Sequence, residues 1–476
     1  MNAALRTAAS LVLGTLAACA VGPDFKEPAP PATDRFVPGA PPKDSDAQRF
    51  VAGQPVPERW WTLFGSPALE AHVARAFAAN PSIASAEAAL RSARESYYAQ
   101  RASFLPTIGG GLAASRNRDA VQVLSPTLTS GSALYNLYTA NVNVSYSLDV
   151  FGGVRRATEQ SAALADLAKA ERDATYLTVA GNVVTAAIQE GVLAEQVAAT
   201  ERAITAARES LAILERQFAA GAVARLDVAA QETALAQLQA TLPPLARQRA
   251  AASHLLAVLE GRLPADAPDA PLALAGLTVP GEVPLGVPAE LVARRPDVRA
   301  AAANLHAATA ADGIAIANLL PSISLSGTIG SSSTALADLL KSGTGFWSAG
   351  ADLTQTLFAG GALVHRKRAA DAALDQAGAD YRSAVLGAYQ NVADALRALE
   401  ADAAALDAAA RAERSAEESL AIVRRQLESG GVGYLALLSA EQAFEQARLA
   451  RIAAVGARLA DTAALFQALA GPAAPR

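Results

Sequence analysis

The chain has 476 residues, of which 52% are hydrophobic, while only 5% are aromatic and 18% are charged. About a quarter of the residues are Ala, which favours helices but buries little surface in a globular core. The net charge of -5 and the lack of a dense basic block argue against a nucleic-acid-binding protein. Four His and one Cys leave little material for a metal or thiol active site. We therefore expect a scaffold of closely packed helices, with no catalytic site, metal or other cofactor.

The first twenty residues predict a bacterial lipoprotein signal. Arg6 precedes the apolar run 11–16, which is too short to span a bilayer and is typical of a secretory signal peptide. The only cysteine, Cys19, follows Leu-Ala-Ala, a pattern that resembles the lipobox of bacterial lipoproteins. The resemblance implies that Cys19 is lipidated, with palmitate among its acyl groups, and begins the mature chain. Since Ala20 rather than Asp follows it, outer-membrane retention is implied. An ordinary signal peptide with an incidental Cys is the alternative.

The segment after this signal predicts an extended tether, because residues 23–57 are rich in Pro and lack periodicity. No later stretch contains 18 consecutive apolar residues, so we expect no transmembrane helix.

The rest of the chain is a tandem repeat, because several short motifs recur in the same order at nearly constant spacing. The recurring pairs are NPSI (80–83) with RPDV (295–298), FLPTI (104–108) with LLPSI (319–323), FGGVR (151–155) with FAGGA (358–362), and RQFAAG (216–221) with RQLESG (425–430). The Pro- and Gly-rich stretch 263–288 joins the two halves.

Each half predicts three helices of unequal length. The opening helices are 81–104 and 296–318, the long helices are 154–218 and 362–428, and the returning helices are 224–260 and 433–469. Each long helix would extend roughly 100 Å at 1.5 Å per residue, and needs packing partners to be stable. Gly221 and Gly430 are placed to end the long helices. Pro243 and Pro244 predict an interruption and a kink in the first returning helix. A secreted coiled coil is the alternative, but sustained Leu heptads are absent.

Four segments that alternate between polar and apolar residues predict amphipathic strands, at about 106–116, 138–150, 321–330 and 346–357. A half-buried soluble sheet and a membrane β-barrel both fit this pattern. Segments of about 10 residues match a tilted bilayer crossing, but four strands cannot close into a barrel, and open edges are not tolerated in lipid. Several copies must therefore contribute: two would give eight strands and three would give twelve. Residues 117–137 and 331–345 would form the external tips.

Four motifs together resemble the TolC-type outer-membrane efflux factor family, in its lipoprotein branch related to OprM and NodT. They are WWTLF (60–64), LVARRPDVR (291–299), LPSISL (320–325) and LFAGG (357–361). The resemblance implies a mainly helical, duplicated fold in a homotrimer, with a 12-stranded barrel in the outer membrane and an α-helical barrel in the periplasm. It also implies a passive exit duct for drugs or other toxic small molecules. The implied partners are a periplasmic adaptor (membrane fusion protein) and an inner-membrane pump, of the RND type. A type I protein secretion duct shares this fold and is the alternative; a periplasmic adaptor or structural protein would have no use for amphipathic strands.

The expected organisation follows from these patterns. It comprises a signal peptide (1–18), a lipidated tether (19–58), the first repeat (59–262), an equatorial linker (263–288), the second repeat (289–470) and a short tail (471–476).

The family resemblance also implies a gate where each long helix turns back, at Gly221 and at Gly430. There, Leu435 matches a position whose apolar ring narrows the pore, and Asp227 matches a carboxylate that links neighbouring helices. Taken from the residues alone, ordinary helix packing for Leu435 and a solvated tip position for Asp227 are the alternatives.

Two departures from the family pattern concern this gate. Ser439 stands where relatives often carry Asp, and the family's Tyr and Arg latch partners fall at Leu427 and Val432, whose side chains cannot hydrogen-bond. Arg225 is the nearest substitute partner for the carboxylate. Since a ring without these carboxylates attracts cations less, we expect weaker block by multivalent cations.

Overall fold

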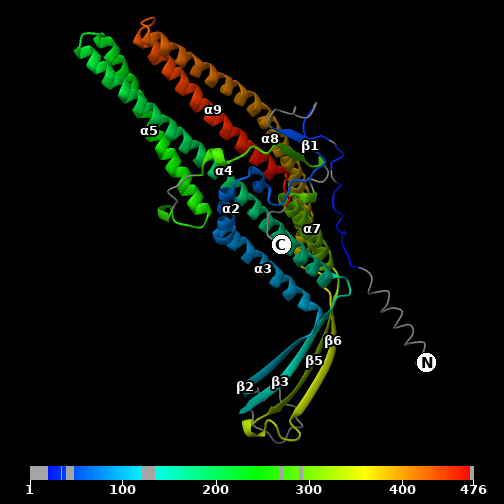
Figure 1. Cartoon of the computed structure of the whole chain (residues 1–476). Coiled ribbons are helices and arrows are strands. Elements are labelled where there is room, and N and C mark those ends of the chain that lie inside the picture. Colours follow the sequence, from blue (N-terminus) through cyan, green and yellow to red (C-terminus); the bar gives the residue numbers. More distant parts are fainter. Residues whose placement is uncertain are drawn as a thin grey trace. The chain divides into compact units, whose positions relative to one another are not determined.

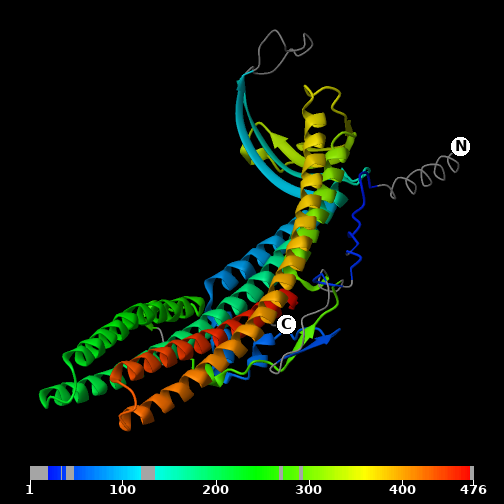
Figure 2. The ribbon, with the colours of Figure 1, turned by 90° about the horizontal axis from the view of Figure 1, so that it is seen from above.

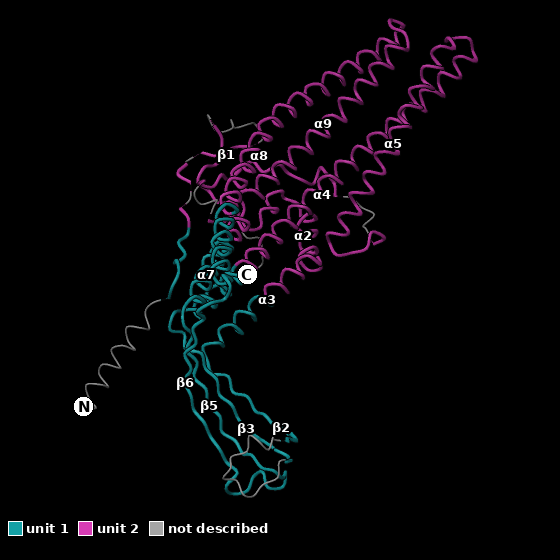
Figure 3. Tube along the Cα trace, turned by 180° about the vertical axis from the view of Figure 1, so that it is seen from behind, with its two compact units in different colours: residues 1–27, 91–166, 302–380 teal, residues 28–90, 167–301, 381–476 magenta. Residues whose placement is uncertain are grey.

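The computed structural model describes residues 20–29, 31–33, 35–38, 48–118, 134–266, 272–288 and 293–471. The predicted signal peptide, its Cys19 and residues 472–476 lie outside this range. The chain divides into two compact units (Figure 3). Unit 1 contains residues 1–27, 91–166 and 302–380, and unit 2 contains residues 28–90, 167–301 and 381–476.

The same series of elements occurs twice along the chain (Figure 1). The first series is α3 (Pro81–Arg101), β2 (Thr107–Arg118), β3 (Leu134–Leu148), α4 (Gly153–Ala219) and α5 (Arg225–Leu259). The second is α7 (Pro296–Ala317), β5 (Ser322–Ser333), β6 (Gly345–Thr354), α8 (Ala362–Glu428) and α9 (Tyr434–Leu469). The remaining elements are β1 (Arg49–Ala52), η1 (Trp60–Phe64), α2 (Pro67–Ala79), η2 (Ala102–Phe104), η4 (Pro264–Asp266), η5 (Leu274–Gly276), β4 (Glu282–Leu285) and η6 (Leu336–Asp338).

Three local expectations differ from the structure. Helix α5 continues through Pro243 and Pro244, so the predicted interruption was wrong. The pair removes only two backbone donors, and both prolines are exposed, so their rings do not displace a packed neighbour. Strand β3 begins at Leu134 and β2 ends at Arg118, so the predicted loop 117–137 is partly strand. The tether is not extended coil throughout, because β1 pairs in parallel with β4 of the inter-repeat segment.

Unit 1 is built on a four-stranded antiparallel sheet in the order β2-β3-β5-β6, whose strands lie side by side (Figure 2). Val142 of β3 is opposite Ile329 of β5, which is opposite Trp347 of β6. Directly opposed residues point to the same face, so the apolar residues of separate strands form one continuous apolar face. These three side chains are 44%, 65% and 78% exposed. Among the described residues, β2 pairs only with β3 and β6 only with β5, so each has an unpaired edge.

The segment that follows Cys19 is attached to the helices of unit 1. Arg156 on α4 donates from Nε to the Val21 carbonyl (3.1 Å) and from Nη2 to the Asp24 carboxylate (2.7 Å). The ring of Phe25 stacks on His306, with centroids 4.3 Å apart, and His306 also contacts the Glu159 carboxylate at 2.9 Å. Residues 20–25 are therefore fixed by charge-assisted hydrogen bonds and ring stacking rather than lying free.

The core of unit 2 concentrates several of the few aromatic residues. Trp60 and Phe64 are fully buried in η1, and both pack against Phe466 of α9, with centroids at 6.1 and 6.2 Å. Trp61 meets Phe77 of α2 edge-on at 5.4 Å, and Phe77 meets Tyr176 of α4 in the same way at 5.0 Å. The WWTLF motif therefore holds the short N-terminal helices against the long ones.

Elsewhere in unit 2 small residues let the long helices approach closely. A Cβ added at Gly456 of α9 would lie 2.3 Å from a methyl carbon of Val192 on α4, and one at Gly181 would lie 2.2 Å from the Gln467 side chain. Helices α4 and α9 each contain an 18-residue window apolar enough to cross a bilayer, although no membrane helix was expected. Those windows are 72% and 56% buried inside the protein, so helix packing accounts for their apolarity.

Candidate functional site

The tips of the two long hairpins in unit 2 have the same backbone geometry. Gly221 follows α4 with φ of 74°, and Gly430 follows α8 with φ of 76°. In the first turn the Ala222 N–H donates to the Gln217 carbonyl at 2.8 Å, and in the second the Gly431 N–H donates to the Gln426 carbonyl at 2.8 Å. This is the Schellman arrangement, in which a left-handed glycine lets the chain satisfy the last carbonyls and reverse. Repeated glycines in the sequence therefore mark both reversals.

Asp227 lies in the first turn of α5, beside the tip. Its carboxylate accepts a hydrogen bond from the Ala224 N–H at 3.2 Å, which satisfies one free donor at the helix N-terminus. Arg225, two residues earlier, pairs instead with Glu232 at 3.3 Å, and both of those side chains are exposed. Within one chain, Arg225 and Asp227 are therefore not brought together as partners.

The second tip has a small apolar cluster beneath it. Leu420, Leu437 and Ala440 are its buried members, and the partly buried Leu427 and Tyr434 pack against them. Leu427 therefore packs within the second hairpin. Burial raises the pKa of the Tyr434 phenol, a hydrogen bond with Ser210 lowers it, and the negative charges of Glu441 and Asp227 raise it slightly.

Leu435 and Ser439 lie on the outer face of α9, away from that cluster. Leu435 is 47% exposed, which is unusual for a Leu at a helix–helix contact, and Ser439 is also exposed. Residues four apart lie one above the other on a helix, so the two side chains share one stripe. Val432 lies in the turn itself and is half-buried.

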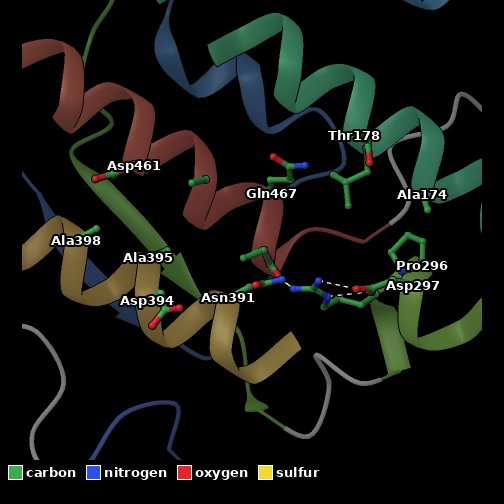
Figure 4. A pocket seen from close by; sticks show the side chains of 14 residues that line it. Ala174, Thr178, Pro296, Asp297, Asn391, Asp394, Ala395, Ala398, Asp461 and Gln467 are labelled. Atoms are coloured by element: carbon green, nitrogen blue, oxygen red, sulfur yellow. Dashed lines mark hydrogen bonds and ion pairs between the residues drawn. The ribbon is translucent and has the colours of Figure 1, made fainter. Parts of the chain in front are cut away.

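The RRPDV motif at the start of α7 has a clear structural role. Arg295 is 8% exposed, donates twice to the Asp297 carboxylate (3.0 and 2.6 Å), and donates once to the Ala468 carbonyl at the end of α9 (3.0 Å). One guanidinium thus joins the beginning of α7 to the end of α9. The site borders a cavity of about 510 Å³, on which Asp394, Asp461 and Gln467 also lie (Figure 4).

A second buried charged group lies between α8 and α9. The Arg458 side chain is 2% exposed and donates to the Leu399 carbonyl. Burial raises the pKa of the Asp402 carboxyl to about 6, with a further contribution from the adjacent Asp461, while Arg458 acts in the opposite sense. No motif in the sequence predicts this group. Its only signal in the sequence is that Arg458 and Asp461 are the two charged residues of the Ala-rich stretch 452–469.

Within the described part of the chain, no group of three or more His, Cys, Asp or Glu side chains is placed to hold a metal ion. The described residues form two long hairpins that reverse at glycine turns, and a sheet that has an exposed apolar face.

Comparison with known proteins decides the family. The family model for outer membrane efflux proteins matches residues 73–262 and 287–471. The chain belongs to the outer membrane efflux protein family. A pyoverdine export outer membrane protein, OpmQ, of Pseudomonas putida is 29% identical over 91% of this chain and 92% of that protein. The solvent efflux pump outer membrane protein SrpC of the same species is 30% identical over 90% of each. The solved outer-membrane channel OprN is 27% identical with a TM-score of 0.85, covering 96% of this chain and all of that one.

Family membership confirms the predicted fold, with its duplicated, mainly helical chain and its β-barrel portion. Members are trimeric ducts of tripartite efflux pumps in the outer membrane of Gram-negative bacteria. The protein is therefore the outer-membrane exit duct of an efflux pump, a transport component and not an enzyme.

Proposed function

We propose that three copies of this chain, each lipidated at Cys19, expel drugs or other toxic small molecules passively. A periplasmic adaptor and an inner-membrane pump of the RND type would deliver the cargo. The observation that carries this proposal is the sheet of unit 1, which has an exposed apolar face and two unpaired edges. Such edges must pair before a sheet enters lipid, and three four-stranded sheets give a barrel with an open lumen. The names of the relatives, which concern pyoverdine export and solvent efflux, support a small-molecule cargo.

Deletion of the gene followed by a susceptibility panel of drugs, solvents and metal salts tests the cargo. We expect greater susceptibility to organic compounds, restored by the complete chain. In parallel, single cysteines introduced at the exposed tip residues Ala222 and Gly433 would be cross-linked in cells to identify the pump and adaptor. Unchanged susceptibility together with the loss of a secreted polypeptide would favour the type I secretion duct instead.

The lipid anchor has its own test. Metabolic labelling with an alkyne analogue of palmitate should mark the wild-type protein but not the Cys19→Ser variant. Since the strands would still insert, we expect the variant to remain in the outer-membrane fraction. Equal labelling of both proteins would contradict the assignment of Cys19.

We propose, further, that the hairpin tips form the gate, with Leu435 narrowing the pore, Ser439 one turn away, and Asp227 linking neighbouring helices in the assembly. Arg225 and Tyr434 are the candidate partners of that carboxylate. The exposure of Leu435 and the position of Asp227 in the first turn of α5, beside the tip, support this arrangement. Leu427 and Val432 would have no latch role, and Gly221 and Gly430 would allow the turns.

Single-channel recording in planar bilayers tests the gate. Leu435→Ala and Asp227→Asn should each raise the time spent open, because one removes apolar bulk and the other a charged partner. La³⁺ added at the tip side should block the wild type weakly and Ser439→Asp strongly, since three added carboxylates would attract it. Ser419→Asp, at an exposed position on α8, is the matched control. Strong block of the wild type, or equal block of both Asp variants, would refute the assignment of Ser439.

A further inference from the structure

Below the tips, all four helices of the two hairpins in unit 2 line a cavity of about 550 Å³. This volume falls within the range of pockets that hold small organic ligands. The lining residues lie at 200–207 on α4, 231–241 on α5, 417–424 on α8 and 438–449 on α9. The cavity is thus separate from the stripe of Leu435 and Ser439.

Much of the wall is apolar and built from small side chains. Ala203, Ala207 and Ala234 are buried there, and so is Leu420. Phe444 adds an aromatic ring from α9. Small residues leave room between the hairpins, and such walls favour the flat or branched apolar body of a ligand.

Two polar side chains on this wall have unsatisfied acceptors. The Gln231 side chain is fully buried, and its Nε2 donates to the Ala207 carbonyl at 2.8 Å, which fixes the orientation of the amide. Its Oε1 then has no hydrogen-bond partner among the described residues, and neither does the buried Oε2 of Glu445. A buried acceptor without a donor is costly, so both atoms favour a ligand that brings N–H or O–H groups.

The charges of the lining favour a cation. Glu417, Glu441 and Glu445 lie on the cavity with one Arg, Arg424, which pairs with Glu441 at 3.3 Å. Burial raises the pKa of Glu445, and the nearby positive Arg448 and Arg202 offset this only in part. A positively charged ligand beside Glu445 would stabilise the ionised form of this carboxyl.

We propose that this cavity binds amphipathic organic cations, whose protonated amine donates to Gln231 and Glu445 while the apolar body lies among the alanines and Leu420. An anion or a ligand with acceptors only would leave both orphan acceptors unpaired. Because the occupant contacts both hairpins, it stabilises whichever arrangement of the hairpins it binds. The site lies in the helical wall and does not depend on the identity of the exported cargo.

Equilibrium binding of 9-aminoacridine to the purified full-length protein in detergent, followed by fluorescence polarisation at pH 7.5, tests the proposal. At that pH this probe is a cation, protonated on the ring nitrogen and carrying N–H donors, whereas acridine has the same ring system but is neutral. We expect saturable binding of one 9-aminoacridine per chain and at least tenfold weaker competition by acridine. Glu445→Gln and Gln231→Leu should each weaken binding about tenfold or more, the usual effect of losing a charged or buried hydrogen bond.

Glu418→Gln is the matched control, because it removes the same charge from an exposed position on α8 next to Glu417 but outside the lining. Its affinity should equal that of the wild type. If Glu418→Gln and Glu445→Gln weaken 9-aminoacridine binding equally, the cation is attracted only by the charge of the surface, and the proposed site is overturned. If acridine binds with the same affinity as 9-aminoacridine, the proposal is also overturned. This comparison uses the wild-type protein alone, so it does not depend on the folding of any variant.

Discussion

Asp402→Asn should stabilise the protein at high pH and leave it nearly unchanged at low pH. In the folded chain the pKa of Asp402 is raised from 3.8 to about 6, through burial and the adjacent Asp461. The folded state therefore binds a proton more tightly than the unfolded state, and the stability supplied by the neutral carboxyl is lost as pH rises through 6. The whole interval corresponds to about 3 kcal/mol at 1.36 kcal/mol per pH unit. The part between pH 5 and 8 is about half of this, and solvent screening reduces it to about 1 kcal/mol.

Guanidinium unfolding, followed by circular dichroism at 222 nm in one detergent from pH 5 to 8, measures this difference. The wild type should lose about 1 kcal/mol more than Asp402→Asn over that range, because Asn mimics the neutral acid and can still donate to Asp461. Asp407→Asn removes an acidic group that is 60% exposed and pairs with Arg411, and it serves as the control. If the wild type and Asp402→Asn lose stability in parallel, the Asp402 carboxyl does not titrate as described.

Three further predictions concern the turns, the sheet and the link between α7 and α9. Gly221→Ala should lower the free energy of unfolding by about 1 to 2 kcal/mol, because the φ of 74° is left-handed. Gly433→Ala should be tolerated, because Gly433 is not left-handed; neither new Cβ would meet another atom, so thermal unfolding of the two variants compares the backbone effect alone. Ile329→Arg, near the middle of β5, should lower the free energy of folding into lipid vesicles by about 2 to 4 kcal/mol, with Thr328→Arg on the opposite face as the control; equal yields would refute the lipid-facing assignment. Arg295→Lys should lower the melting temperature, because an ammonium group cannot make the two parallel hydrogen bonds to the Asp297 carboxylate together with the one to the Ala468 carbonyl. An unchanged melting temperature would contradict this.

Much of the architecture could be predicted because its signals are periodic and long. The two-residue alternation around Val142 and Ile329 located the strands, and the pairing of these two residues explains why separate patterns form one face. The long helices were also predictable from their Ala-rich composition, and the glycines that end them from their position after each helix-favouring run.

Other features depend on contacts that one sequence does not display. Strand β1 is only four residues long, lies in a Pro-rich segment and owes its form to β4, so no local periodicity announced it. Pro243 and Pro244 lie inside a helix of 35 residues despite their low helix propensity, and the sequence around them gives no sign of this. The Gln231 oxygen without a donor and the half-buried pair Asp402 and Asp461 result from the packing of separate helices, and along the chain these residues look like ordinary polar positions.

The N-terminal segment is attached at two places, residues 20–25 on the helices of unit 1 and residues 49–52 on strand β4. Each attachment keeps the other at a high effective concentration, since a released end remains tethered within a few tens of ångströms of its site. Release therefore requires both contacts to open together, and weakening one of them would show as faster exchange rather than loss of the segment. A modest clamp such as Arg156 can in this way hold a segment that a single contact of the same strength would not.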